Sequence, residues 1–221
     1  MRPELKTELE KTIHDNHTIK LRIYSFLEET EKTVDFAVSS ILTNYKQMEH
    51  KAALMTIIKE LCKNAVEANM KKVFFDDIEA NIDNDFHYKK GKERFLELNK
   101  KDLAEFARKA RNENLFAELT LDYSPEKIII QVLNNRSLWP IEEEEILENS
   151  KNASKYSNIL SYYKEVKKNK NTPKNGITLI TLLLKSENLD LNLFSVDKIQ
   201  TGKENLTVIK IVFPISKDFY K

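Results

Sequence analysis

A carboxylate and an amide stand one helical turn apart in the segment IIKELCKNAVEANMKK, residues 57–72. These residues are Glu60 and Asn64, set among apolar residues spaced as in a packed helix. Positions i and i+4 share a helix face, so both side chains can address one ligand. Magnesium prefers oxygen ligands and keeps several waters, so one amide oxygen suffices where phosphates supply the rest. The pair indicates a nucleotide with its metal; the alternative is a solvent-facing polar pair on an amphipathic helix.

The helix KELCKNAVEA resembles the N-box of the GHKL superfamily, the ATP-binding fold shared by gyrase, heat shock chaperones, histidine kinases and a mismatch-repair protein, in which E-L-x-x-N-A recurs. The resemblance implies a Bergerat-type fold with ATP or ADP and Mg²⁺ as cofactor. In that fold, Asn64 would coordinate the magnesium ion, and Glu60 would be the catalytic residue that activates a water or orients the attacking group. The order of elements is most similar to the anti-sigma-factor kinase and histidine kinase branch.

A second landmark of that family, D-N-G-P-G-I-P, corresponds here to NNRSLWP, residues 134–140. Pro140 is retained, and Asn134 replaces the aspartate that accepts a hydrogen bond from the adenine amino group. A neutral acceptor gives up the charge-assisted part of that bond, on the order of 1 kcal/mol or more. Arg136 and Leu138 replace two glycines, where a side chain is expected to strain the turn or to occupy the adenine pocket.

The third landmark, a glycine-rich lid end that holds phosphates on a helix N-terminus, corresponds to PKNGITLIT, residues 173–181. Gly176 matches one glycine, Thr178 replaces the next, and Lys174 is placed to meet a phosphate. The chain has three glycines in all, so most of the phosphate-binding turns are missing. The resemblance therefore implies weak or lost ATP binding and turnover. The implied cofactor-binding residues are Asn64, Asn134, Lys174, Gly176 and Thr178, with Asn64 at the metal.

Other candidates have simpler interpretations. His14 and His17 invite a phosphoacceptor role, but a strand follows almost at once, and histidines near a terminus are usually solvated. Cys62 is expected to be a small core residue. Trp139 and Tyr162 are either lid packing residues or partner contacts.

A lysine cluster in the lid can meet phosphates or nucleic acid, but a charge run is more often a solvated face. Pairing within the lid, with the acidic run 142–145, is equally consistent with the sequence, although exposed pairs add little stability. The cluster consists of Lys164, Lys167, Lys168, Lys170 and Lys174.

The first half of the chain must position Glu60 and Asn64. Alternating apolar and polar residues predict a strand at 18–24, and helical spacing predicts helices over 28–45 and 51–70. Residues 71–75 (KKVFF) can form a short strand. Residues 76–115 are predicted to be a helical insertion of unknown role.

The second half supplies the other two landmarks. A turn at Ser124 and Pro125 joins predicted strands 116–122 and 127–133. Residues 141–175 are predicted to be a mobile, partly helical lid with little to bury. A helix from Gly176 precedes strands near 189–196 and 206–213, joined by a turn containing Gly202. This order predicts an α/β (α+β) two-layer sandwich, with a mixed, largely antiparallel sheet covered on one face by helices.

Composition sets the remaining expectations. A length of 221 residues predicts one domain over 1–221, with an N-terminal extension at 1–17. The 36 basic and 35 acidic residues do not favour nucleic acid as a partner. No apolar run is long enough for a bilayer, and the single cysteine excludes an intrachain disulfide, so a cytoplasmic protein is expected.

Two classes of function follow. The first is an active Mg-ATP-dependent kinase or ATPase that modifies a protein serine or histidine. The second is a signalling or scaffold protein that keeps the fold without efficient catalysis and presents the lid and the insertion to a protein partner. The sequence favours the second class, with a homodimer through the first strand's edge as one possible assembly.

Overall fold

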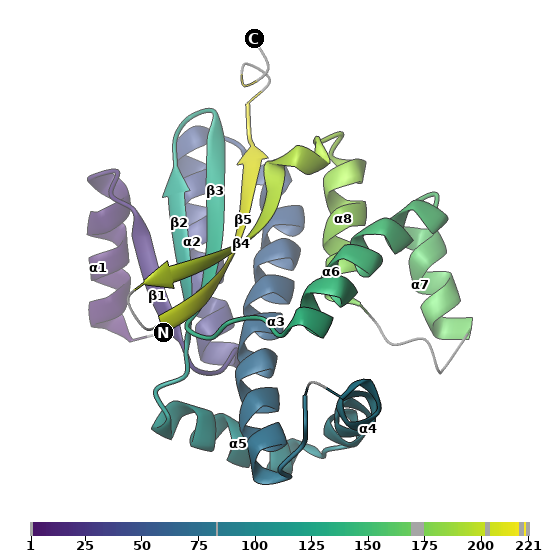
Figure 1. Cartoon of the computed structure of the whole chain (residues 1–221). Helices are drawn as coiled ribbons and strands as arrows, with labels where there is room; N and C mark the ends of the chain where they lie inside the picture. Colours follow the sequence, from purple (N-terminus) through teal and green to yellow (C-terminus); the bar gives the residue numbers. More distant parts are fainter. Residues whose placement is uncertain (1, 83, 169–174, 202–203, 217–218, 220–221) are drawn as a thin grey trace.

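The computed structural model describes residues 2–82, 84–168, 175–201, 204–216 and 219 of the chain. Its elements are α1 (Pro3–His14), β1 (Ile19–Ile23), α2 (Glu28–Tyr45), η1 (Met48–His50), α3 (Lys51–Asp77), α4 (Asp85–Leu96), α5 (Lys100–Asn112), β2 (Ala117–Tyr123), β3 (Lys127–Asn134), α6 (Pro140–Asn152), η2 (Ala153–Lys155), α7 (Ile159–Lys168), α8 (Gly176–Ser186), η3 (Leu191–Leu193), β4 (Phe194–Thr201) and β5 (Glu204–Pro214). Figure 1 shows their arrangement.

The strands form one five-stranded sheet in the order β1-β2-β3-β5-β4. Helices α2 and α3 lie behind it in the view of Figure 1, and α8 packs beside α3. The predicted α/β fold with a largely antiparallel sheet is confirmed, and every pairing in the described sheet is antiparallel. The register places Asn134, at the end of β3, opposite Thr207 on β5.

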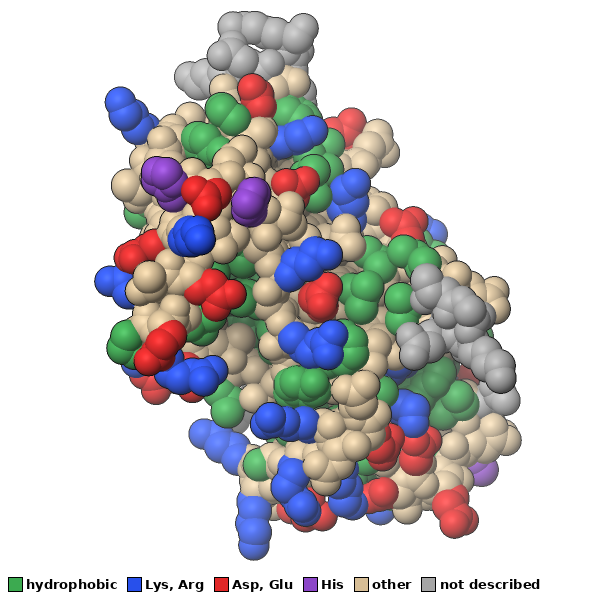
Figure 2. All heavy atoms as spheres, turned by 90° about the vertical axis from the view of Figure 1, so that its left-hand side faces the viewer, with side chains coloured by type: hydrophobic (Ala, Val, Ile, Leu, Met, Phe, Trp, Pro, Cys, Tyr) green, Lys and Arg blue, Asp and Glu red, His purple; other side chains and the backbone are tan. Residues whose placement is uncertain are grey.

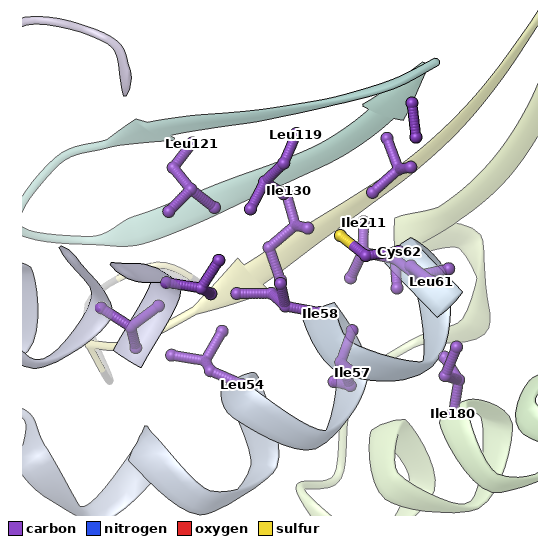
Figure 3. Packing of buried hydrophobic residues seen from close by; sticks show 14 of the residues in the cluster. Leu54, Ile57, Ile58, Leu61, Cys62, Leu119, Leu121, Ile130, Ile180 and Ile211 are labelled. Carbon is purple, nitrogen blue, oxygen red and sulfur yellow. The ribbon is translucent and has the colours of Figure 1, made fainter. Parts of the chain in front are cut away.

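The core lies between the sheet and α3. The strands alternate buried and less buried residues with a period of two, so each strand turns one face toward this core. Leu119 and Ile130 point from the sheet toward Ile58 on α3, as Figure 3 shows. Cys62 belongs to the same core, and burial raises the pKa of its thiol to about 12. This agrees with the expectation of a small core residue.

The predicted boundaries hold for the first strand, the helix at 28–45 and the hairpin. The prediction of a strand at 71–75 is wrong, because these residues continue α3 to Asp77. In the helix, the side chains of Val73, Phe74 and Phe75 are all buried. The strand expected from 189 begins instead at Phe194. There the Asp190 side chain accepts a hydrogen bond from the Asn192 N–H and favours a 3₁₀ turn. Gly202 lies outside the described residues.

The N-terminal extension contains helix α1, whose Leu9 and Ile13 are buried in the main core. Figure 2 shows the side of the molecule that is at the left in Figure 1, where α1 lies. Basic and acidic side chains are interspersed over much of this face, without a patch of one sign covering it. Among the described helices, none is both long and apolar enough to cross a membrane.

The insertion packs on the C-terminal half of α3 as two helices, α4 and α5. Phe74 contacts the rings of Phe95 and Phe106, one from each inserted helix. Gly91 on α4 faces Phe75 so closely that a Cβ at residue 91 would lie 2.7 Å from the ring Cζ. The insertion therefore shares the core of the domain, and a glycine permits the close approach of α4.

Replacing Gly91 with alanine is expected to lower the free energy of unfolding by about 1–2 kcal/mol. Overpacking a core costs about 1–3 kcal/mol, and the better helix propensity of alanine offsets about 1 kcal/mol or less. Urea unfolding followed by circular dichroism measures the change. Adding Phe75→Leu, which shortens the facing side chain, should recover part of the loss relative to Phe75→Leu alone. Unchanged stability of Gly91→Ala would contradict this packing.

The lid also has a core, so the prediction that it has little to bury is wrong. Ala153 and Tyr162 are buried with Leu179 and Leu182 of α8 in a second apolar cluster. Helices α6 and α7 thus lie on α8 as packed elements. Residues 169–174 of the lid are outside the described part.

Candidate functional site

A cavity of about 280 Å³ lies where the landmarks of the sequence converge. Its walls come from α3, α4, α6, the start of α8, the end of β3 with the loop that follows it, and the first half of β5. It contains apolar walls and a few polar side chains, the usual composition of a small-molecule site. Its lining residues are Asn64, Ala65, Glu67, Ala68, Lys71, Lys92, Phe95, Leu96, Val132, Asn134, Arg136, Leu138, Glu142, Glu145, Ile146, Asn149, Asn175, Gly176, Ile177, Thr207 and Ile209.

Glu60 and Asn64, the carboxylate and amide of the first landmark, lie close to Gly176, the first residue of α8. A Cβ on Gly176 would lie 2.9 Å from Oε2 of Glu60 and 3.0 Å from Nδ2 of Asn64. The two side chains therefore do share a face, as their i, i+4 spacing predicts, and that face is turned toward the start of α8. Three predicted site residues from two separate landmarks are thus brought together.

Asn134 joins the cavity from the end of β3. Its Nδ2 donates a 3.0 Å hydrogen bond to the carbonyl oxygen of Ala65 on α3, which fixes the orientation of the amide. Its Oδ1 is buried and has no hydrogen-bond partner among the described groups. A buried acceptor without a partner costs about 1–3 kcal/mol, so this oxygen is suited to a donor from a ligand or a water.

Arg136 and Leu138 are the two residues expected from the sequence to strain the turn or to occupy the pocket. Neither is among the described non-glycine residues with positive φ, so the expected backbone strain is not found. Both residues line the cavity. The guanidinium of Arg136 lies 4.8 Å from the centre of the Trp139 ring and donates to both carboxylate oxygens of Glu142, at 2.7 and 2.8 Å.

Glu142 is the centre of a buried charge cluster. Its carboxylate also lies 2.5 Å from Nζ of Lys71 and accepts a hydrogen bond from the Trp139 N–H, which caps α6. Burial acts to raise the pKa of Glu142, but Lys71 and Arg136 outweigh it and hold the pKa below its ordinary value. Burial lowers the pKa of Lys71, and Glu142 opposes that effect. The cluster ties the first turn of the lid to α3.

Sequence reasoning missed this cluster and also missed Thr207. The Thr207 hydroxyl donates to the carbonyl oxygen of Arg136 and accepts from the Leu138 N–H, both at 3.0 Å. It therefore holds the loop that follows β3. The inward position of Thr207 is recoverable from strand alternation, but its place opposite Asn134 depends on the register between strands distant in sequence.

The start of α8 is occupied by groups of the protein itself. The Asn175 side chain caps the helix, because its Oδ1 accepts from the Thr178 N–H at 3.1 Å. The Thr178 hydroxyl donates to the carbonyl oxygen of Asn149 on α6 and is buried, so Thr178 joins lid and helix. The Tyr162 hydroxyl accepts from the Asn175 N–H at 2.6 Å. Lys174 lies outside the described residues.

The remaining candidates lie away from the cavity or serve packing. His14 and His17 are exposed at and just after the end of α1. Trp139 and Tyr162 are packing residues: Trp139 contacts the ring of Phe75, and Tyr162 is 2% exposed.

The acidic run pairs outside the lid. Glu142 binds Lys71 and Arg136, Glu145 binds Lys92 on α4, and Glu143 binds Lys198 on β4. Of the lid lysines, those at 164, 167 and 168 are exposed on α7, whereas 170 and 174 lie outside the described residues.

The donor set fits a magnesium ion only in part. Within the described ranges, no group of three or more His, Cys, Asp or Glu side chains could hold a metal. Asn64 offers one amide oxygen, so any magnesium ion here would depend on oxygens supplied by a ligand and by water. The buried, unpaired Asn134 Oδ1 fits a ligand that carries an N–H donor.

Comparison with known proteins adds no functional name. No protein-family model matches the chain, and no solved structure matches it. An uncharacterized protein of Treponema pallidum (strain Nichols) is 22% identical over 207 residues, which cover 94% of this chain and 40% of that protein. The chain thus spans about two fifths of the length of this curated relative.

Proposed function

We propose that this chain is a histidine kinase-like, GHKL-type module of signal transduction that binds a purine weakly, has little or no ATP turnover and acts through a protein partner. One observation carries the proposal. Asn64, Asn134 and Gly176, each from a different landmark of the sequence, line a single cavity of the folded chain. A chance match to a short motif would not predict that its distant partners meet at one site.

The base-recognising end of the cavity supports a purine ligand. Apolar walls from Ala65, Val132 and Ile209 flank the buried Asn134, which suits a flat ring with a polar edge. The Asn134 amide cannot turn over without placing its oxygen against the Ala65 carbonyl oxygen, so the free atom is an acceptor. An exocyclic amino group is the donor that such an acceptor selects.

The remaining landmarks favour weak turnover over efficient catalysis. Phosphoryl transfer depends on positioning and on electrostatic stabilisation of the phosphates. Among the described residues of the lid end, Gly176 is the sole glycine, and the Thr178 N–H and hydroxyl both have partners within the protein. A protein that keeps the fold but holds phosphates poorly is suited to ligand-dependent or constitutive partner binding.

Calorimetric titration with ADP and Mg-ATP tests the proposal. We expect a dissociation constant on the order of 0.1–1 mM and no ATP hydrolysis above background. Asn134→Leu should remove binding, because it deletes the acceptor and puts an apolar side chain of similar size in its place. Asn44→Leu, at an exposed position of α2, is the matched control.

Three results would contradict the proposal. Silence of the wild-type protein at millimolar nucleotide would exclude the purine site. Micromolar binding with sustained hydrolysis would establish an active kinase or ATPase instead. Binding that Asn134→Leu leaves unchanged would place the ligand elsewhere.

A further inference from the structure

The cavity continues past the proposed base site to the inserted helix α4. Phe95 and Leu96, at the end of α4, line it together with Ile146 of α6 and Ala68 of α3. We call these four apolar residues the α4 subsite. Three of them, Phe95, Leu96 and Ile146, lie outside the landmarks of the sequence. The cavity thus contains apolar surface beyond the residues that flank Asn134.

Helix α3 gives the order of the parts of the cavity. Asn64 lies at the start of α8, where a Cβ on Gly176 would be 3.0 Å from its Nδ2. Asn134 is hydrogen-bonded to the next residue of α3. The ring of Phe95 on α4 lies 5.7 Å from the ring of Phe74, which is ten residues beyond Asn64 and roughly 15 Å further along the helix. Figure 1 shows α4 beside this end of α3, so a ligand that extends from the start of α8 past Asn134 points toward α4.

An ion pair ties α4 to α6 beside this subsite. Nζ of Lys92 lies 2.6 Å from Oε1 of Glu145, and both residues line the cavity. The Tyr88 hydroxyl of α4 donates to the other oxygen of the same carboxylate at 3.4 Å. Lys92 lies one helical turn before Leu96, and Glu145 precedes Ile146 directly. The two helices that build the subsite are therefore held together, which favours binding without rearrangement.

Leu96 lies where the α4 subsite reaches the surface. It is 65% exposed, whereas the neighbouring Phe95 is 7% exposed. An apolar group seated against both residues would remove part of the Leu96 side chain from water, and such burial is the main favourable term in association. The subsite is therefore suited to a ligand that extends from the buried base to the surface at Leu96.

We infer that the ligand of this cavity is an adenine nucleotide that carries an apolar group on its amino nitrogen, with this group seated in the α4 subsite. Such a substituent replaces one of the two amino hydrogens, so the other still donates to the Asn134 Oδ1. The amino group lies at the end of the purine ring away from the sugar, so its substituent points away from Asn64 and toward α4. The inference rests on the proposed purine site, specifies its ligand and gives the helical insertion a role in recognition.

Calorimetric titration of the wild-type chain with ADP and N6-benzyl-ADP tests this inference. N6-benzyl-ADP is expected to bind about tenfold more tightly than ADP, because its phenyl ring leaves water for the α4 subsite. The control ligand is 8-benzylamino-ADP, which carries the same apolar group at the end of the base beside the sugar. It should bind no more tightly than ADP, because its substituent does not point toward α4.

Two variants locate the substituent. Leu96→Ala should lower the advantage of N6-benzyl-ADP over ADP by about threefold and leave ADP binding unchanged, because Leu96 would contact only the substituent. The matched control is Leu147→Ala on α6, a leucine that is 57% exposed and lies outside the cavity lining in the described part of the chain. It should change neither affinity. Both positions are exposed, so both variants should fold as the wild-type chain does, which circular dichroism checks.

The outcomes separate the two proposals. ADP binding with no gain from the N6-benzyl group would overturn the inference and leave the purine site intact. Equal gains from the two benzyl isomers would also overturn it, because the apolar group would then bind without regard to direction. An advantage that Leu96→Ala leaves unchanged would place the substituent away from α4. Absence of binding by all three ligands would overturn the purine site together with the inference.

Discussion

Replacing Glu142 with glutamine is expected to lower the free energy of unfolding by about 3–5 kcal/mol, because it leaves two buried cations without a counter-charge. The side chains of Arg136 and Glu142 are each 6% exposed, and that of Lys71 is 14% exposed. The attraction between such groups is not screened as it is at the surface. Urea unfolding followed by tryptophan fluorescence measures the change, since Trp139 lies beside Arg136.

The control is Glu143→Gln, at the residue next to Glu142 in the sequence. It breaks an exposed pair with Lys198 and should cost less than about 1 kcal/mol. The triple change Arg136→Met, Lys71→Met and Glu142→Leu should restore most of the stability, because it removes all three buried charges. A Glu142→Gln protein as stable as Glu143→Gln would contradict the cluster.

The same cluster predicts a dependence on pH. The pKa of Glu142 in the folded chain is below the value of 4.5 expected when it is unfolded. Its contribution to stability is therefore complete above pH 4.5 and is lost as the pH falls through the folded pKa. The stability difference between the wild-type chain and Glu142→Gln should accordingly shrink in acid.

Replacing Tyr162 with alanine is expected to cost about 3 kcal/mol, at the lower end of the range for a buried aromatic residue. Tyr162 is 2% exposed and packs edge-on to Tyr156 in the second apolar cluster. Its hydroxyl holds both backbone groups of Asn175, the cap of α8. The loss should therefore be accompanied by faster hydrogen exchange in α7 and at the start of α8, which mass spectrometry detects.

Two further variants divide this effect. Tyr162→Phe keeps the ring and should cost about 1–2 kcal/mol, because the Asn175 N–H loses its acceptor. Leu160→Ala, on the same helix but 71% exposed, should change stability by no more than about 0.5 kcal/mol. Equal exchange rates in wild type and Tyr162→Ala would show that α7 does not depend on this contact.

These two predictions concern the two attachments of the lid. Glu142 ties α6 to α3, and Tyr162 ties α7 to the start of α8. Both attachments border the proposed ligand site, so a destabilised lid should also weaken ADP binding. The stability of the lid and the affinity of the cavity can thus be compared in one set of variants.

Local pattern was sufficient for much of the fold. The strand at Ile19–Ile23, the helix at Glu28–Tyr45 and the hairpin around Ser124 follow from period-two and helical spacing and from turn residues. Residues 71–75 did not follow, because β-branched and aromatic residues favour a strand locally. The burial of Phe74 and Phe75 against the inserted helices decides for a helix.

The sequence by itself determined that Glu60 and Asn64 share one helix face, because helical periodicity acts between near neighbours. It also determined that Arg136 and Leu138 bring side chains into the loop that follows the hairpin. Only the tertiary structure decided what those side chains contact. The partners of Arg136, Thr207 and Tyr162 come from segments distant in the chain, and their contacts depend on strand register and helix packing, which no local pattern encodes.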